Sequence, residues 1–327
     1  MNDDNGRELK VFAGRNCIDL SERVAQHLGT PLGHARTESF PDGELIVHIE
    51  EDVRGRDCFV VLSTNHPVNE NLMELLIFAD SLKRASARRI TAVVPYFGYA
   101  RQDRKERGRT PITAKLVANL ITTAGYGRVL ALDLHAAQIQ GFFDLPVDHL
   151  TCNGIFLQHF MAVREQLGEL VLVSPDVGNV KVASSYAGQL DAELAFIHKK
   201  RVTGDLVETG TLVGDVEGKT VLMVDDMIST AGTVVEAGAL VRRLGAERVV
   251  VAATHAVLAG RAMERLSSSE IDEIVVTNTI PPGNRYMPIR DRIRVLCVSK
   301  LLADAIDHIH HDKSVSALFR QYADSKR

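Results

Sequence analysis

Short apolar runs alternate along the chain with longer stretches in which apolar residues recur at helical spacing. The run at 57–63 is followed by a helical pattern at 69–85 and by a second run at 89–97. The second half repeats this alternation, with runs at 170–176 and 220–226. Near-continuous apolar strands that alternate with helices are typical of parallel sheets covered on both faces. The pattern therefore predicts an α/β protein with doubly wound, mainly parallel sheets.

The length of the chain indicates two such units. Its 327 residues are enough for about two ordinary domains, and the strand and helix patterns have similar spacing in the two halves. The polar stretch DLPVDHLTCNG lies between the halves. We therefore expect two similar domains, at 1–150 and 151–327.

Composition excludes several classes of protein. The chain is 45% hydrophobic and 24% charged, which is typical of a soluble globular protein, and its net charge of −4 argues against a nucleic-acid partner. Apolar runs stay well short of the roughly 18 residues of a membrane span, and the first ten residues do not resemble a signal peptide. The four cysteines form no CxxC pair and are expected to be free thiols. We expect a cytoplasmic protein without a membrane partner.

The stretch TVLMVDDMISTAGT, at 220–233, joins an apolar strand to a helix. Asp225 and Asp226 end the run, and Thr230, Gly232 and Thr233 lead into the helix. A helix N-terminus offers free N–H groups to a phosphate. Paired carboxylates can bind a diol, either by accepting hydrogen bonds from its hydroxyls or through a shared Mg²⁺. This arrangement indicates a ribose phosphate site. An ordinary helix N-cap beside two acidic residues is the alternative.

Residues 95–115 form a basic stretch after another strand. Its cations are Arg101, Arg104, Lys105, Arg107 and Arg109. Arginine makes bidentate contacts with phosphate oxygens, so a basic run in an acidic protein suits a polyphosphate. A solvated basic loop is the alternative.

Three further segments place polar side chains at or just after strand ends. Asp133 and His135 could contact a metal or a phosphate, or serve the fold alone, and Asp176 precedes a helix start. Lys199 and Arg201 would point to the same face of a strand, because side chains alternate with a period of two. Two cations on one face favour an anionic ligand, since they would otherwise repel each other.

Taken together and in this order, these segments resemble the ribose-phosphate pyrophosphokinase family, also called phosphoribosyl pyrophosphate synthetases. The matching motifs are FPDGE at 40–44, RQDRK at 101–105, DLH at 133–135, SPD at 174–176 and VDDMISTAGT at 224–233. The resemblance covers nearly the whole chain. It implies domains of phosphoribosyltransferase type and transfer of the diphosphoryl group of ATP to the C1 hydroxyl of ribose 5-phosphate. The products would be 5-phosphoribosyl 1-diphosphate, for nucleotide biosynthesis, and AMP.

The resemblance also assigns roles to the matching positions. The N-terminal domain would bind ATP and serve assembly, and the C-terminal domain would bind ribose 5-phosphate. ATP would be contacted by Phe40, Asp42 and Glu44 of a neighbouring subunit and by Arg101, Gln102 and His135. Mg²⁺ would lie near His135 and Asp176, with Asp133 close by. Lys199 and Arg201 would be the catalytic cations. Ribose 5-phosphate would be held by Asp225, Asp226, Ser229, Thr230, Ala231, Gly232 and Thr233.

Regulation and assembly follow from the same resemblance. The phosphate-activated class of the family implies an allosteric phosphate/ADP site across subunits, matched here by Arg54, Lys105, Arg109, Ser314 and Ser316. The class also implies a homo-oligomer, a hexamer built from dimers.

The chain departs from the family pattern at several positions. His198 and Lys200 replace an acid and an arginine, Asn179 replaces a glycine, and Ser229 stands where relatives carry an acid. Two alternatives remain open. A phosphoribosyltransferase would share the loop at 225–233 but usually needs one domain. A regulatory homologue without turnover would be favoured by loss of the cations at 199 and 201, which are present.

Overall fold

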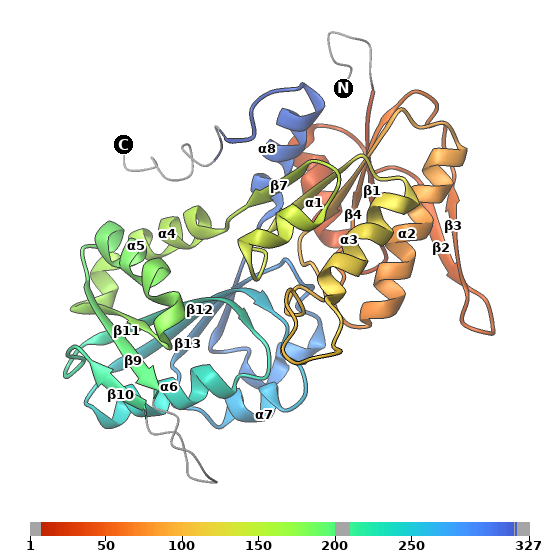
Figure 1. The fold of residues 1–327 in the computed structure, drawn as a ribbon. Coiled ribbons are helices and arrows are strands. Elements are labelled where there is room, and N and C mark those ends of the chain that lie inside the picture. The colour runs from red at the N-terminus through yellow and green to blue at the C-terminus, as the bar shows by residue number, and fades with distance from the viewer. Residues whose placement is uncertain (1–7, 200–209, 317, 319–327) are drawn as a thin grey trace. The chain divides into compact units, whose positions relative to one another are not determined.

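The computed structural model describes residues 8–199, 210–316 and 318 (Figure 1). Lys200 and Arg201 therefore lie outside the described residues. Among the helices that are described, each is too short or too polar to cross a lipid bilayer.

The chain divides into two compact units, and each is interrupted in sequence. The first consists of the described residues of Met1–Cys152, Thr279–Pro281 and Cys297–Arg327, and the second of Asn153–Asn278 and Pro282–Leu296. The expected second domain, 151–327, thus differs from the second unit, because the C-terminal helix belongs to the first.

The first unit is built on a five-stranded parallel sheet. Its order is β1-β4-β5-β6-β7, and the ladder sets Val11 opposite Phe59 and Phe59 opposite Thr91. The strands are β1 (Leu9–Ala13), β4 (Asp57–Val61), β5 (Arg89–Val94), β6 (Arg128–Leu132) and β7 (Val147–Leu150). A separate antiparallel hairpin pairs β2 (Ala35–Ser39) with β3 (Leu45–Ile49).

Helices cover both faces of this sheet. The helices are α1 (Ile18–Leu28), α2 (Val68–Arg84), α3 (Thr113–Ala124) and α8 (Ser299–His310), with the 3₁₀ helix η1 (Ala137–Phe142). Phe12 and Val60 share one apolar cluster with Phe78 of α2 and Ile121 of α3. Val11 is equally buried but points to the other face, because side chains alternate along a strand. That face is covered by α1 and α8, which contact each other.

A buried polar cluster fastens α8 to the sheet. Asp57 has no exposed side-chain surface and accepts hydrogen bonds from Nε of Arg89, at 2.8 Å, and from Nδ1 of His310, at 2.8 Å. The Arg89 guanidinium also donates to the carbonyl of Ile309, at 2.9 Å, and pairs with Asp312 at 2.9 Å. The hydrogen bond to Asp57 raises the pKa of Arg89 further, so this cation stays charged. The cluster therefore joins the last helix to strands β4 and β5.

The second unit is built on a seven-stranded sheet of order β10-β9-β8-β11-β12-β13-β14. Among the described strands of this sheet, β9 and β10 are the only neighbours that pair antiparallel. The strands are β8 (Leu170–Ser174), β9 (Glu193–Lys199), β10 (Gly210–Val213), β11 (Thr220–Ile228), β12 (Arg248–Ala256), β13 (Glu273–Thr277) and β14 (Ile293–Leu296).

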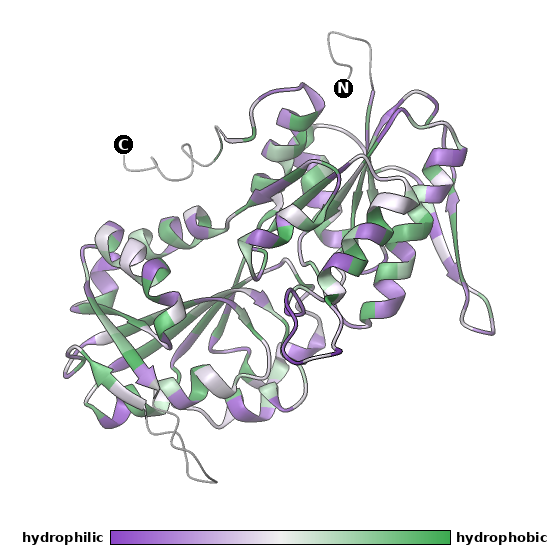
Figure 2. Ribbon diagram, viewed as in Figure 1, coloured by the Kyte–Doolittle hydropathy of each residue, from purple (hydrophilic) through white to green (hydrophobic). Residues whose placement is uncertain are grey.

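Helices again lie on both faces, with α4 and α5 on one side and α6 and α7 on the other (Figure 1). These are α4 (Asn153–Ala162), α5 (Val180–Leu190), α6 (Gly232–Arg243) and α7 (Ala262–Ser267), with the 3₁₀ helices η2 (Arg164–Leu167), η3 (Val177–Asn179) and η4 (Asn284–Ile289). Figure 2 shows the strands of both sheets as largely hydrophobic and the outer helix surfaces as polar. The predicted α/β class with mainly parallel sheets is confirmed.

The strand order of the second unit has a switch point. From β8 the chain goes through α5 to β9 on one side, whereas β11 lies on the other side of β8. Ligands of open parallel sheets bind beyond the carboxyl ends of the strands at such a point. The loops after β8 and β11 are therefore the place to look for a site.

Candidate active site

The switch point brings together residues from two distant stretches of the sequence. Asp176 follows β8, and Asp225 and Asp226 lie within β11, which continues to Ile228 rather than ending at the aspartates. Strand β8 pairs with β11 only at 220–222, so the two strands separate before the carboxylates. Asn179 spans the opening and donates from Nδ2 to the carbonyl of Val224 at 2.6 Å.

Negative charge is concentrated around Asp225. Burial raises the pKa of this carboxyl to about 7, and the neighbouring charges of Asp226 and Asp176 add to the effect. Only the Asp226 N–H, which donates to Oδ1 of Asp225 at 2.9 Å, favours the charged form. A nearby cation or hydroxyl donor would stabilise the charged form of such a carboxylate. The site thus has the chemistry to bind a diol or a divalent ion.

A candidate anion site lies next to the carboxylates. Helix α6 begins at Gly232, and its first-turn N–H groups lack acceptors within the helix. The preceding residue, Ala231, is left-handed at φ 61°, a conformation that is uncommon for a residue other than glycine. The loop before it is fixed by two backbone bonds, from Leu258 to the carbonyl of Ile228 and from Ala259 to that of Ser229. The predicted phosphate cradle is therefore a defined, partly strained turn.

Sequence reasoning missed Arg265, which reaches this turn from α7. Its Nη1 donates to the carbonyl of Thr230 at 2.9 Å, and it lies 3.3 Å from where a side chain on Gly232 would begin. The sequence carries no signal for this contact, because the two residues are far apart in the chain and belong to different elements.

In the first unit, the basic stretch begins at a tightly held turn. The N–H of Gly98 donates to Oγ1 of Thr64 at 2.6 Å, and a side chain on Gly98 would begin 2.3 Å from the Thr64 carbonyl. Only glycine permits this approach. Beyond the turn, the carbonyl of Gln102 accepts a hydrogen bond from Ala114 at 3.2 Å, and its side-chain oxygen accepts one from Thr113. Gln102 is therefore held at the start of α3.

The cations of this stretch face solvent. Arg101, Arg104, Lys105 and Arg109 are all exposed, and Figure 2 shows the loop between β5 and α3 as strongly hydrophilic. Arg109 adopts a left-handed φ of 64°. This exposure fits both a polyphosphate site and a solvated basic loop.

After β6 the chain carries Asp133 and His135, which have different surroundings. Oδ2 of Asp133 accepts a hydrogen bond from the Cys152 N–H at 3.0 Å, so part of this carboxylate serves the fold. His135 is exposed. Nearby, burial lowers the pKa of His149, whose Nε2 accepts from the Leu134 N–H at 2.9 Å. The neutral form of His149 suits that acceptor role.

Metal ligands are sparse in the described part of the chain. It contains no group of three or more His, Cys, Asp or Glu side chains arranged to hold an ion. A cation at this site would therefore need oxygen ligands from a bound substrate as well, which is the usual way in which proteins bind Mg²⁺ with phosphates.

The hairpin β2–β3 presents Phe40 at its tip, with 48% of its surface exposed. The turn closes through the Phe40 N–H, which donates to the Glu44 carbonyl at 2.8 Å, and through Asp42, whose carboxylate accepts from the Glu44 N–H at 3.1 Å. The three predicted residues thus share one turn.

The base of the hairpin is fastened by a buried carboxylate. Glu74 of α2 has no exposed surface and accepts hydrogen bonds from Nε of Arg15, at 3.1 Å, and from the hydroxyl of Thr37, at 3.0 Å. Arg15 also donates to Ser39, next to Phe40, at 3.2 Å. The orientation of the hairpin therefore depends on Glu74.

The remaining predicted residues lie at element ends. Arg54 is exposed shortly before β4, and Ser314 and Ser316 are exposed after α8. The carbonyl of Ser314 is 2.9 Å from Nδ1 of His308. Lys199 ends β9, where its backbone lies opposite Gly210 of β10.

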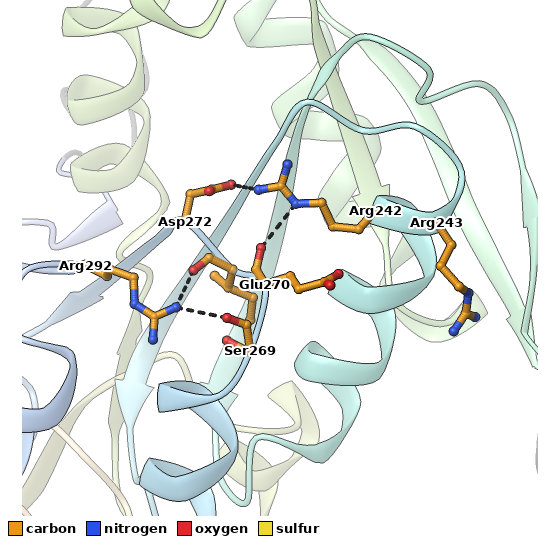
Figure 3. Close-up of a pocket in the computed structure, with 7 residues that line it drawn as sticks. Arg242, Arg243, Ser269, Glu270, Asp272 and Arg292 are labelled. Atoms are coloured by element: carbon orange, nitrogen blue, oxygen red, sulfur yellow. Dashed lines mark hydrogen bonds and ion pairs between the residues drawn. The ribbon is translucent and has the colours of Figure 1, made fainter.

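Not every cavity of the second unit is suited to a ligand. One of about 630 Å³ lies at the C-terminal end of α6, at the edge of the sheet opposite the switch point (Figure 3). Its Arg242 donates to the carbonyl of Glu270 at 3.3 Å and pairs with Asp272. Its Arg292 donates to the carbonyl of Ser269 at 3.1 Å. These guanidinium groups serve the fold, which leaves little capacity for an anion.

Fold and site together define an α/β protein with a carboxylate pair and a helix N-terminus at the switch point of a mainly parallel sheet. Comparison with known proteins identifies its family. Residues 9–125 match the family model for the N-terminal domain of ribose phosphate pyrophosphokinase, and residues 208–320 match the phosphoribosyl synthetase-associated domain. The chain belongs to the ribose-phosphate pyrophosphokinase family, as its motifs indicate.

Full-length relatives agree with the family models. The chain is 53% identical to a ribose-phosphate pyrophosphokinase of Rhodopirellula baltica, over 96% of this chain and 99% of the relative. It is 49% identical to one from Fusobacterium nucleatum, with the same coverage of both chains. The crystal structure of phosphoribosylpyrophosphate synthetase from Mycobacterium smegmatis matches with a TM-score of 0.86 and 43% identity, over 94% of this chain and 100% of that one.

Proposed function

We propose that this protein is a ribose-phosphate diphosphokinase, which transfers the diphosphoryl group of ATP to the C1 hydroxyl of ribose 5-phosphate. The observation that carries the proposal is the switch-point site, with Asp225, Asp226 and the α6 N-terminus, in a chain of this family. The products are 5-phosphoribosyl 1-diphosphate and AMP. We propose that the enzyme serves nucleotide biosynthesis and that it is cytoplasmic.

The second unit supplies groups suited to the acceptor. The carboxylates of Asp225 and Asp226 accept hydrogen bonds from the ribose hydroxyls, and the turn from Ser229 to Thr233 holds the 5-phosphate. The C1 oxygen then attacks the β-phosphorus and loses its proton, and the bond to the AMP oxygen breaks. Positioning of the two substrates supplies much of the acceleration in such a transfer.

Residues of the first unit are proposed to hold ATP. Arg101, Gln102 and His135 belong to this set, and Phe40, Asp42 and Glu44 reach the ATP of a neighbouring subunit. The exposed Phe40 supports the latter assignment, because an apolar tip on a fastened hairpin suits contact with an adenine ring.

Asp176 and His135 are proposed to lie at Mg²⁺, with Asp133 nearby. The surroundings of Asp225 support a cation here, because burial and the nearby charges of Asp226 and Asp176 raise the pKa of that carboxyl. Mg²⁺ would neutralise charge on the ATP phosphates. The carboxylate oxygens are hard ligands that fit this ion.

One assay tests the activity. ATP, ribose 5-phosphate and Mg²⁺ are mixed with the enzyme without a nucleobase, and AMP and 5-phosphoribosyl 1-diphosphate are measured. We expect equal amounts of the two products. Tight binding of ribose 5-phosphate without AMP would instead favour a regulatory homologue. Release of diphosphate from added 5-phosphoribosyl 1-diphosphate, only when a nucleobase is also present, would favour a phosphoribosyltransferase.

Lys199 and Arg201 are proposed as the cations that stabilise the transferring group. Lys199→Ala should lower kcat by about 100-fold or more, since a cation acting on the transition state contributes several kcal/mol. The melting temperature should change little. Lys313→Ala is the control, because it removes an exposed lysine from the other unit. Unchanged turnover in Lys199→Ala would remove the residue from the mechanism.

Regulation is proposed at a phosphate/ADP site formed by Arg54, Lys105, Arg109, Ser314 and Ser316. Their exposure leaves these side chains open to an anion and to a second subunit. We propose a homo-oligomer, a hexamer built from dimers. Velocity should rise with inorganic phosphate, and ADP should inhibit in part without competing with ATP. A velocity independent of phosphate, with purely competitive ADP, would contradict this site.

A further inference from the structure

The loop proposed to hold the 5-phosphate is fastened by one side chain from outside it. Arg265 of α7 donates from Nη1 to the carbonyl of Thr230 at 2.9 Å. The same nitrogen lies 3.3 Å from the position of a side chain on Gly232, so the guanidinium packs against the first residue of α6. Arg265 thus contacts both sides of Ala231, the residue between them.

The contact fixes the direction of a peptide group. The bond between Thr230 and Ala231 is planar and trans, so its N–H points away from its carbonyl. Because Arg265 holds the carbonyl on its own side, the N–H of Ala231 is directed to the opposite side. The following N–H groups belong to the first turn of α6. Consecutive N–H groups around a left-handed residue form a concave anion site.

The contact also offsets backbone strain. Ala231 adopts φ 61° and ψ 3°, which costs a residue with a Cβ about 1–2 kcal/mol. Such strain persists only where the surroundings enforce it. A charge-assisted hydrogen bond to the preceding carbonyl has the strength to do so.

The helix that carries Arg265 is itself held in place by hydrogen bonds. Arg292 donates to the carbonyls of Leu266 and Ser267, at 2.8 and 3.1 Å, which end the short helix α7. Arg261, one turn before Arg265, instead pairs with Glu264 at 2.6 Å. Of these two helix cations, Arg265 is the one that contacts the loop.

We propose that Arg265 is a positioning residue for ribose 5-phosphate: it holds the Thr230–Ala231 peptide so that the loop N–H groups face the 5-phosphate. The proposal rests on the proposed function. It assigns to Arg265 an effect on binding of the acceptor, with little effect on ATP.

The first test compares Arg265→Ala with Arg261→Ala, which removes one cation from the N-cap position of the same helix. We expect Arg265→Ala to raise the KM for ribose 5-phosphate at least about tenfold, with the KM for ATP within about twofold. Arg261→Ala should leave both unchanged. Arg265→Lys should recover part of the loss, because an ammonium still donates to the carbonyl. Equal increases in both KM values, or no increase, would overturn the proposal.

The second test separates positioning from direct contact with the phosphate. Glycine adopts a positive φ without strain, so Ala231→Gly added to Arg265→Ala should lower the KM for ribose 5-phosphate by about threefold or more. No recovery would show that the guanidinium acts on the ligand itself, which overturns the positioning role. Should the unaltered enzyme form no AMP, the proposed function fails, but calorimetric titration of ribose 5-phosphate into the same variants still tests Arg265.

Discussion

At the scale of single residues, the site combines groups whose properties depend on their neighbours. Asp225 is an ordinary acid in the sequence, yet burial and two adjacent carboxylates raise its pKa to about 7. Ala231 is an ordinary small residue, yet it occupies a strained conformation beside the anion site. Neither property is visible in the residue type. The motif predicts which residues take part, and the packing decides their charge and geometry.

The raised pKa of Asp225 predicts a pH-dependent stability. In the unfolded chain this carboxyl titrates near its ordinary value of about 4. Between about pH 4 and pH 7 the folded protein therefore binds more protons, so this group lowers the free energy of unfolding as the pH rises through that window. Asp225→Asn should be more stable than the unaltered protein by roughly 1–4 kcal/mol at pH 8, and the difference should shrink towards pH 4.

Urea unfolding of both proteins across this pH range, in the presence of a chelator, measures the difference. Asp291→Asn, which alters a side chain with 90% of its surface exposed, is the control and should show no trend. A constant difference between Asp225→Asn and the unaltered protein would contradict the shifted pKa. Activity should be lost in Asp225→Asn at every pH, because the variant lacks a carboxylate that is proposed to bind the ribose hydroxyls.

At the scale of elements, the apolar pattern predicted much of the architecture. The runs at 57–63, 89–97 and 220–226 all contain strands of parallel sheets, because apolar strands covered on both faces have a distinctive composition. The predicted second domain did not anticipate that α8 joins the first unit, because apolar periodicity does not specify which sheet a helix covers. The contact of Arg265 with Thr230 was missed for a similar reason, since a single side chain joins helix α7 to the loop before α6.

The contacts of Glu74 predict that loss of its charge destabilises the β2–β3 hairpin. Glu74→Gln keeps one acceptor oxygen and loses the charge that holds Arg15, so we expect a loss of roughly 1–3 kcal/mol in the free energy of unfolding. The KM for ATP should rise, because the hairpin that carries Phe40 loses its fixed orientation. Urea unfolding and steady-state kinetics measure the two effects. Glu70→Gln, an exposed position one turn earlier in α2, should change neither.

At the scale of the whole molecule, each unit has its own sheet and its own task in the proposed reaction. The first unit carries the residues assigned to ATP and to regulation, and the second carries those assigned to ribose 5-phosphate. Both ends of the chain contribute to the first unit, through β1 and α8. The stability of the first unit therefore depends on residues that follow the second unit in sequence.

Asp57 is the residue on which this dependence can be measured. Asp57→Asn leaves Arg89 without its buried counter-charge and removes the carboxylate that contacts His310. We expect a loss of roughly 3–5 kcal/mol in the free energy of unfolding, as for other broken buried pairs. Hydrogen exchange should then increase in α8 before it increases in the second unit. Asp312→Asn is the matched control, because Asp312 pairs with the same arginine but is 60% exposed, and it should cost less than about 1 kcal/mol. Equal losses in the two variants would contradict the anchoring role of Asp57.

The interrupted first unit also bears on how the protein is made. A chain leaves the ribosome from its N-terminus, and domains tend to fold in that order. Here α8, which contacts α1, emerges only after the entire second unit. One apolar face of the N-terminal sheet therefore stays incompletely covered until α8 has been synthesised. A translation product that stops before α8 would leave that face of the first sheet incompletely covered, which would expose apolar surface to chaperones and proteases.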